Sequence, residues 1–138
     1  MSPALLVIDV QKGMFAFPEY PAFNADPVCA AISDLVSRAR EAAVPVIFVK
    51  HDEPGALAAG NPLHEVIDEI APVDSEPVVT KTRNSAFLGT PLLDMLKERG
   101  IDHLVICGLQ TDHCVDTTVR AAQEHGFTMT IAAGAHTT

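Results

Sequence analysis

The sequence predicts a three-layer α/β fold: a doubly wound, Rossmann-like parallel β-sheet flanked by helices on both faces. Short apolar runs alternate with helical patterns along the whole chain. Each run is apolar at successive positions, which is typical of strands buried on both faces. Internal repeats and low-complexity segments are absent from the sequence. Because strand–helix–strand units have right-handed crossovers, this pattern favours a doubly wound sheet.

The first half of the chain contains two predicted strands and a long helix between them. Residues 4–8 form the first strand, and residues 44–49 form the second, with Pro45 at its entrance, where a missing N–H is tolerated. Asp26-Pro27 predicts the start of the helix, because a capping side chain precedes a proline at the first helical position. The apolar stripe of this helix consists of Val28, Ala31, Ile32, Leu35, Val36 and Ala39.

The second half continues the alternation with shorter elements. Three more strands are predicted, at residues 78–80, 103–107 and 127–132. Three helices are predicted, from Asn61-Pro62 to about Glu69, from Thr90-Pro91 to Gly100 and from about Asp112 to Gly126. Ligands of doubly wound sheets bind outside the carboxyl ends of the strands, where the strand order reverses. We expect that point between the first and fourth strands, so that Asp9 and the loop leading to Cys114 face each other.

Composition and charge narrow the class of protein. The length of 138 residues predicts one domain, residues 1–138. An apolar content of 48% suffices for a hydrophobic core without disulfides or structural metals. A net charge of −9 argues against nucleic-acid and membrane-surface partners. Three cysteines without paired spacing favour a reducing, cytoplasmic compartment. We expect no signal peptide, because the apolar run at residues 4–8 is too short and lacks a basic start, and we expect no membrane span.

Cys114 is the candidate nucleophile. It lies in what the pattern predicts to be the first turn of a helix, with Thr111 or Asp112 as the cap. Free N–H groups and the helix dipole favour a thiolate at such a position. The alternative is a buried structural cysteine, and this second interpretation is the one we adopt for Cys29 and Cys107.

Two charged side chains could activate that thiol. Asp9 ends the first strand, where partial desolvation would raise its pKa and make it a proton acceptor. It could instead only cap the following loop. Gln11 is expected on the same side, to orient the acid or the substrate. Lys81 follows the third strand, and its flexible arm could reach both groups, although the residues alone do not favour Lys81 over Arg83.

Histidine, metal and nucleotide chemistry are less well supported. His113 adjoins Cys114, but neighbours on a helix point about 100° apart, so we do not expect it to be the base. His51, Glu53 and His64 could form a metal site, yet their spacing is loose, and we expect no metal and no cofactor. Neither GxGxxG nor GxxxxGK[ST] is present, which removes the usual dinucleotide and triphosphate sites.

These residues resemble the isochorismatase-like cysteine hydrolase family. The similarity includes Asp9-Val10-Gln11, residues 81–92 (KTRNSAFLGTPL) and residues 108–121 (GLQTDHCVDTTVRA), in the order found in that family. The resemblance implies a catalytic triad of Asp9, Lys81 and Cys114. It also implies a non-proline cis peptide at Leu109–Gln110, which aims backbone N–H groups, including that of Cys114, into an oxyanion hole.

The chain departs from family patterns at two places. Zinc-dependent nicotinamidases carry Asp-x-His after the second strand, whereas this chain has His51-Asp52-Glu53, which argues against that activity. Family members usually continue beyond the region where this chain ends, at Thr138. We therefore expect an open sheet edge or helical face covered by a partner chain in a homo-oligomer, or a truncated relative.

Three functions follow from these observations. The first is an amidohydrolase that cleaves a C–N bond of a small amide, ureido or carbamoyl compound through a Cys114 thioester. The second is an isochorismatase-type vinyl-ether hydrolase, which needs Asp9 and Lys81 but not the thiol. The third is a non-catalytic binding or assembly module. In the enzymes, we expect Phe15, Phe87, Gln11 and His113 to contact a small-molecule substrate.

Overall fold

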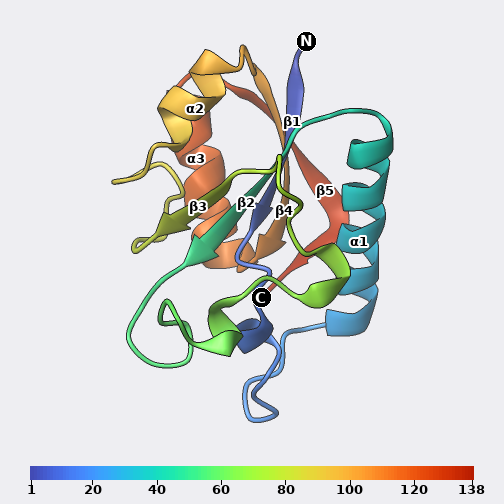
Figure 1. The fold of residues 1–138 in the computed structure, drawn as a ribbon, viewed down its shortest axis with the longest axis vertical. Coiled ribbons are helices and arrows are strands. Elements are labelled where there is room, and N and C mark those ends of the chain that lie inside the picture. Colours follow the sequence, from blue (N-terminus) through green and yellow to red (C-terminus); the bar gives the residue numbers. More distant parts are fainter.

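A computed structural model describes residues 1–138 and has the three-layer architecture that the sequence predicts (Figure 1). One sheet contains five strands: β1 (Pro3–Ile8), β2 (Val46–His51), β3 (Val78–Lys81), β4 (His103–Leu109) and β5 (Thr128–Thr137). Their order is β3-β2-β1-β4-β5, and every neighbouring pair is parallel. The strand order reverses between β1 and β4, so the ligand crevice of this fold class belongs there.

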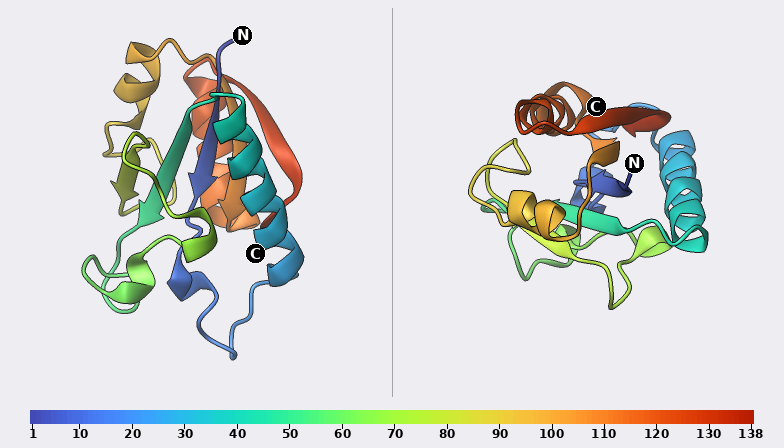
Figure 2. Two further views of the ribbon diagram at one scale, coloured as in Figure 1. Left: turned by 45° about the vertical axis from the view of Figure 1, so that its right-hand side comes forward. Right: turned by 90° about the horizontal axis from the view of Figure 1, so that it is seen from above.

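Helices cover both faces of the sheet. Helix α1 (Ala25–Glu41) lies on one face, and α2 (Leu92–Glu98) and α3 (Asp116–Glu124) lie on the other (Figure 2). Alternate residues of β1 serve the two layers: Leu5 and Val7 pack in the core under α1, whereas Leu6 and Ile8 pack in the core under α2 and α3. This double burial is the reason that the strands read as uninterrupted apolar runs. No helix combines the length and the apolar character needed to cross a bilayer.

The helix predicted from Asn61-Pro62 to about Glu69 is wrong. Two separate 3₁₀ turns, Pro62–His64 and Asp68–Ile70, take its place. Between them the backbone is extended and pairs with the segment after β1: the N–H of Lys12 donates to the carbonyl of Glu65, and the N–H of Ile67 donates to the carbonyl of Val10. These long-range bonds use the groups that a helix would have paired internally, so tertiary pairing overrides the local pattern.

β5 extends to Thr137 and so exceeds the predicted residues 127–132. Its register against β4 shifts between Ile106 and Gly108, after which pairing resumes at Gly108–His136. Gly134 lies in the intervening stretch of β5 with a φ of +75°, which a glycine adopts readily. The glycine permits a local kink, and the strand then returns to the sheet.

Candidate active site

Asp9 follows β1 in an unusual backbone conformation. Its φ is +55°, in the left-handed region that aspartate tolerates better than most residues, and its N–H donates to the carbonyl of Val49. The residue is completely buried. Oδ2 lies 3.1 Å from Nζ of Lys81, but neither carboxylate oxygen has a partner in hydrogen-bond geometry. Asp9 is thus a buried carboxylate whose charge is compensated by one ion pair.

Lys81 is the last residue of β3, and its side chain is completely buried. Nζ donates to three acceptors: Nδ1 of His51 at 3.0 Å, the carbonyl oxygen of Arg83 at 3.0 Å and Sγ of Cys114 at 3.2 Å. The structure therefore decides between Lys81 and Arg83. Arg83 is exposed, and only its backbone carbonyl contacts the ammonium.

Cys114 lies in a single π-helical turn, Thr111–Val115, that joins β4 to α3. The pKa of its thiol is raised to about 11: burial raises it most, the Asp9 carboxylate also raises it, and Lys81 lowers it. The expectation that a capped helix terminus favours the thiolate is therefore wrong. Neither Thr111 nor Asp112 caps this turn with its side chain, and desolvation is the largest of the effects on the pKa of the thiol.

Burial raises the pKa of Asp9 as well as that of Cys114. Burial raises the pKa of Asp9 from its ordinary 3.8, although the charge of Lys81 acts against it. Because the pKa of the thiol is raised as well, Cys114 keeps its proton at neutral pH. The Asp9 carboxylate and the Cys114 sulfur both contact the Lys81 ammonium. The raised pKa of the acid brings it closer to that of a competent proton acceptor.

A cavity of about 310 Å³ opens above these groups at the carboxyl edge of the sheet. We call it the site cavity. Its lining combines five residues from the strand ends and the π turn with four from the loops: Asp9, His51, Gln110, His113 and Cys114, with Met14, Glu53, Leu57 and Asn84. Two larger hollows, of about 490 and 520 Å³, lie elsewhere and contact none of Asp9, Lys81 and Cys114. The site cavity is the one that gives access to the thiol.

The peptide bond between Leu109 and Gln110 is cis. Gln110 lines the site cavity, whereas Leu109 is buried in the core on the α1 side. Gly108 precedes them with a φ of +125°, and a Cβ at this position would lie 1.9 Å from the carbonyl oxygen of Ile8. Only a glycine allows β4 to approach the end of β1 this closely, and that approach brings the Cys114 turn next to Asp9.

Of the four expected substrate contacts, only His113 lines the site cavity. Phe15 lies in a different hollow beside Cys29, and Phe87 is buried against Phe127 and His125. Gln11 is completely buried and bonds with its amide to the backbone N–H and carbonyl of His51. Gln11, Phe15 and Phe87 thus do not line the site cavity, and each of them is used in packing or in holding a neighbouring strand.

The structure does not bring His51, Glu53 and His64 together as a set of metal ligands. Nδ1 of His64 is buried and lies 2.8 Å from the carbonyl oxygen of Leu57, while Nε2 of His51 lies 3.5 Å from Oε2 of Glu53. Donor atoms of Asp9, His51 and Cys114 do lie within 4.8 Å of one another. The ammonium of Lys81 contacts all three of these donors, so a lysine supplies the positive charge that they surround.

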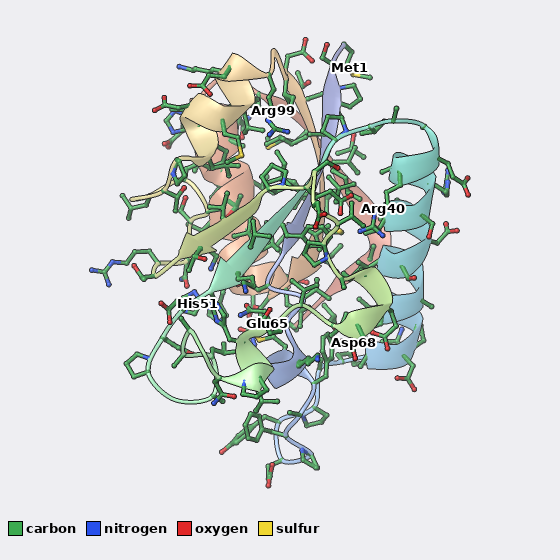
Figure 3. The ribbon with its side chains drawn as sticks, viewed as in Figure 1. Met1, Arg40, His51, Glu65, Asp68 and Arg99 are labelled. Atoms are coloured by element: carbon green, nitrogen blue, oxygen red, sulfur yellow. The ribbon has the colours of Figure 1, made fainter.

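His51 and Asn84 are site residues that the sequence did not identify as neighbours of the triad. Oδ1 of Asn84 lies 3.9 Å from Sγ of Cys114. His51 ends β2 and pairs in register with Lys81 of β3. Figure 3 labels it at the carboxyl end of its strand. That position was the available signal, because His51 ends its strand at the same edge of the sheet at which Asp9 follows β1.

Comparison with known proteins gives a consistent result. The isochorismatase domain family matches residues 3–138. The isochorismatase family protein YddQ of Bacillus subtilis is 34% identical over 134 residues, covering 92% of this chain and 73% of that protein. Streptothricin hydrolase of Streptomyces noursei is 38% identical over 141 residues, covering 98% of this chain, which spans about half (54%) of that enzyme.

Solved structures agree with the sequence comparison. N-carbamoylsarcosine amidase of Thermoplasma acidophilum superposes with a TM-score of 0.86 at 29% identity, covering all of this chain and 85% of that one. The isochorismatase of Pseudomonas putida superposes with a TM-score of 0.92 at 31% identity, covering 98% and 70%. The family resemblance expected from the sequence motifs is confirmed, and the chain belongs to the isochorismatase family of hydrolases.

Proposed function

We propose that this chain is a cysteine amidohydrolase that cleaves a C–N bond of a small amide, ureido or carbamoyl compound. The observation that carries the proposal is the position of the Lys81 ammonium, 3.1 Å from the Asp9 carboxylate and 3.2 Å from Sγ of Cys114. The names of two relatives, streptothricin hydrolase and N-carbamoylsarcosine amidase, support hydrolysis of this general kind.

The proposed reaction begins with transfer of the thiol proton from Cys114 to Asp9. The sulfur then attacks the carbonyl carbon of the substrate, and the Lys81 ammonium stabilises the negative charge on the thiolate as it forms. The carbonyl oxygen becomes an oxyanion, which the backbone N–H groups of the turn after Leu109–Gln110, including that of Cys114, are proposed to stabilise.

Breakdown of that intermediate completes the cycle. Asp9 returns its proton to the leaving nitrogen, the C–N bond breaks, and an acyl thioester remains on Cys114. Asp9, again a carboxylate, then takes a proton from water as the water oxygen attacks the thioester. The C–S bond breaks, Asp9 passes the proton taken from water to the departing thiolate, and the acid product leaves. No redox partner is needed at any step.

The site cavity supports a small and mainly polar substrate. Its volume of about 310 Å³ is near the lower end of the range for ligand sites. Met14 and Leu57 supply apolar wall, whereas Glu53, Asn84, Gln110 and His113 supply hydrogen-bonding groups around the opening. A compact amide whose nitrogen or second carbonyl can be hydrogen-bonded fits this lining better than a long apolar chain.

Replacement of Cys114 tests the proposal directly. We expect Cys114→Ala to lose turnover of small amides by at least about a thousandfold, because the acyl acceptor is gone. Mass spectra of the native chain should show an acyl adduct on Cys114 during turnover. Cys29→Ala is the matched control, since Cys29 lies on α1 away from the site cavity and its loss should leave turnover unchanged.

The other two candidate functions give different outcomes in the same experiment. A vinyl-ether hydrolase would remain active on isochorismate after Cys114→Ala, because the thiol is not its nucleophile. A non-catalytic module would show neither turnover nor an acyl adduct with any compound of the panel. Either result would replace the amidohydrolase proposal.

A further inference from the structure

The ammonium of Lys81 has three hydrogens and three acceptors. These acceptors are Nδ1 of His51, the carbonyl oxygen of Arg83 and Sγ of Cys114, at 3.0, 3.0 and 3.2 Å. The Asp9 carboxylate is paired with Lys81 by charge but lies outside hydrogen-bond geometry. The direction of the N–H that reaches the thiol is therefore fixed by where the other two N–H groups go.

His51 meets the requirement for one of these acceptors only in a single tautomer. An ammonium can only donate, so Nδ1 of His51 must carry its lone pair toward Lys81, and the ring proton must be on Nε2. Nε2 faces Oε2 of Glu53 at 3.5 Å, an arrangement that favours this tautomer. In this tautomer Nδ1 of His51 accepts a hydrogen bond from the lysine.

The backbone of His51 is fixed by two hydrogen bonds with the side chain of Gln11. Gln11 accepts from the N–H of His51 at 2.9 Å and donates to its carbonyl at 3.0 Å. Gln11 is itself completely buried and also donates to the carbonyl of His64. The ring of His51 is only 14% exposed, so water does not readily replace it as the acceptor.

We propose that His51 is a positioning residue that fixes the rotation of the Lys81 ammonium, so that one N–H is aimed at the sulfur of Cys114. The inference rests on the part of the proposed function in which Lys81 activates Cys114. It assigns no proton-transfer step to His51. Without the Nδ1 acceptor, a buried N–H would be left unpaired, and the ammonium would turn toward the Asp9 carboxylate and away from the thiol.

Two conservative variants separate this role from simple packing. In His51→Asn the amide oxygen replaces Nδ1, whereas in His51→Gln the amide lies at the position of Nε2 and the acceptor for Lys81 is missing. The measurement is the rate at which iodoacetamide alkylates Cys114, followed peptide by peptide in mass spectra across a range of pH. The charged or titratable groups that act on this thiol are Asp9, Lys81 and, through Lys81, His51 and Glu53.

We expect His51→Gln to slow alkylation of Cys114 at neutral pH about tenfold, the change that corresponds to a rise of about one unit in the thiol pKa. His51→Asn should stay within about threefold of the native rate. Equal rates in all three proteins, or equal slowing in both variants, would overturn the proposal.

Internal references make these outcomes unambiguous. Cys29 is partly exposed and should be alkylated at the same rate in every protein, while completely buried Cys107 should stay unlabelled as long as the chain is folded. His103→Asn is a control for loss of a histidine at the opposite end of the sheet, where its ring contacts Thr128 and Thr130. Alkylation requires no substrate. A chain that hydrolyses no amide but shows the expected alkylation pattern would disprove the proposed function and leave this inference standing.

Discussion

Asp9 differs from most buried carboxylates in what it lacks. Such groups are usually stabilised by two or three N–H donors, which lower their pKa. Asp9 has no donor in hydrogen-bond geometry, and burial raises its pKa despite the ion pair with Lys81. The residue adopts a positive φ that places it beside the thiol at a cost in backbone energy. A carboxylate in this environment is less stable as an anion and correspondingly better suited to accept a proton.

Asp9→Asn should therefore change the pKa of the Cys114 thiol and the turnover rate in different ways. The Asp9 carboxylate raises the pKa of Cys114 by like-charge repulsion, so its removal, with Lys81 still present, should lower that pKa from about 11. At any pH below that value the variant would then hold more thiolate than the native chain. Turnover should nevertheless fall by about a hundredfold or more, because no group carries the proton to the leaving nitrogen.

The measurement is a pH titration of thiolate ultraviolet absorbance, compared with turnover of the same samples. Asp112→Asn is the control, since Asp112 is exposed in the same turn and its carboxylate accepts a hydrogen bond from Thr138. An unchanged or higher thiol pKa in Asp9→Asn would contradict the assignment of Asp9 as the neighbouring charge.

At the scale of the elements, the site depends on how closely β1 and β4 approach each other. Asp9 follows β1, and the turn that carries Cys114 follows β4, so any separation of these strands moves the proposed base away from the proposed nucleophile. Gly108 is the contact point, because there is no room for a side chain against the carbonyl of Ile8.

Gly108→Ala should accordingly destabilise the fold by roughly 3 kcal/mol or more. Both the positive φ and the clash oppose the methyl group, and the atom that it meets belongs to the backbone, so rotation of a side chain cannot relieve it. Urea unfolding measures the change. Gly126→Ala is the matched control: its φ is +90° but the space around it is open, so only the conformational cost of about 1–2 kcal/mol is expected. Equal losses in the two variants would contradict a special role for Gly108.

The sequence predicted the elements well where local pattern and tertiary burial agree. The central runs of β1, β2 and β4, residues 4–8, 46–49 and 104–107, are apolar without interruption because both of their faces are covered, and that pattern is visible in a single sequence. It failed at residues 61–69, where pairing with residues 10–12 decides the conformation. Asp9 and Cys114 could be predicted as neighbours, because both follow strands whose carboxyl ends meet where the strand order reverses. The exclusion of Phe15, Phe87 and Gln11 from the site cavity could not, because it depends on the course of loops.

In the whole molecule, one ion pair connects helix α1 to the segment before β3, at the edge of the sheet opposite the site cavity. Arg40 of α1, labelled in Figure 3, donates from Nε and Nη2 to the two oxygens of Glu76, at 2.9 and 2.7 Å. Glu76 lies just before β3, the strand that carries Lys81. Burial acts to raise the pKa of Glu76, but the hydrogen bonds from Arg40 and from the N–H of Val73 lower it below 4.5.

Glu76→Gln should reduce the free energy of unfolding by about 1 kcal/mol at neutral pH, since Arg40 is partly exposed and the pair is screened. A lowered pKa in the folded state means that the stabilisation is present above the unfolded value of 4.5 and is lost as the pH falls through the folded value. The difference between native chain and variant should thus shrink in acid. Urea unfolding at several pH values tests this, with Glu65→Gln, which removes the exposed contact with Lys50 at 3.4 Å, as the control. A difference that grows in acid would contradict the sign.

The division of the site cavity between strand ends and loops has a consequence for how such a protein can diversify. The atoms of the proposed triad are held at the edge of the sheet, whereas Glu53 and Leu57 come from the connection that leaves β2. Exchange of that connection would give a catalyst with the same bond-breaking apparatus and a different choice of compounds. Natural variation and laboratory libraries can therefore change selectivity at positions outside the strands that carry Asp9 and Lys81.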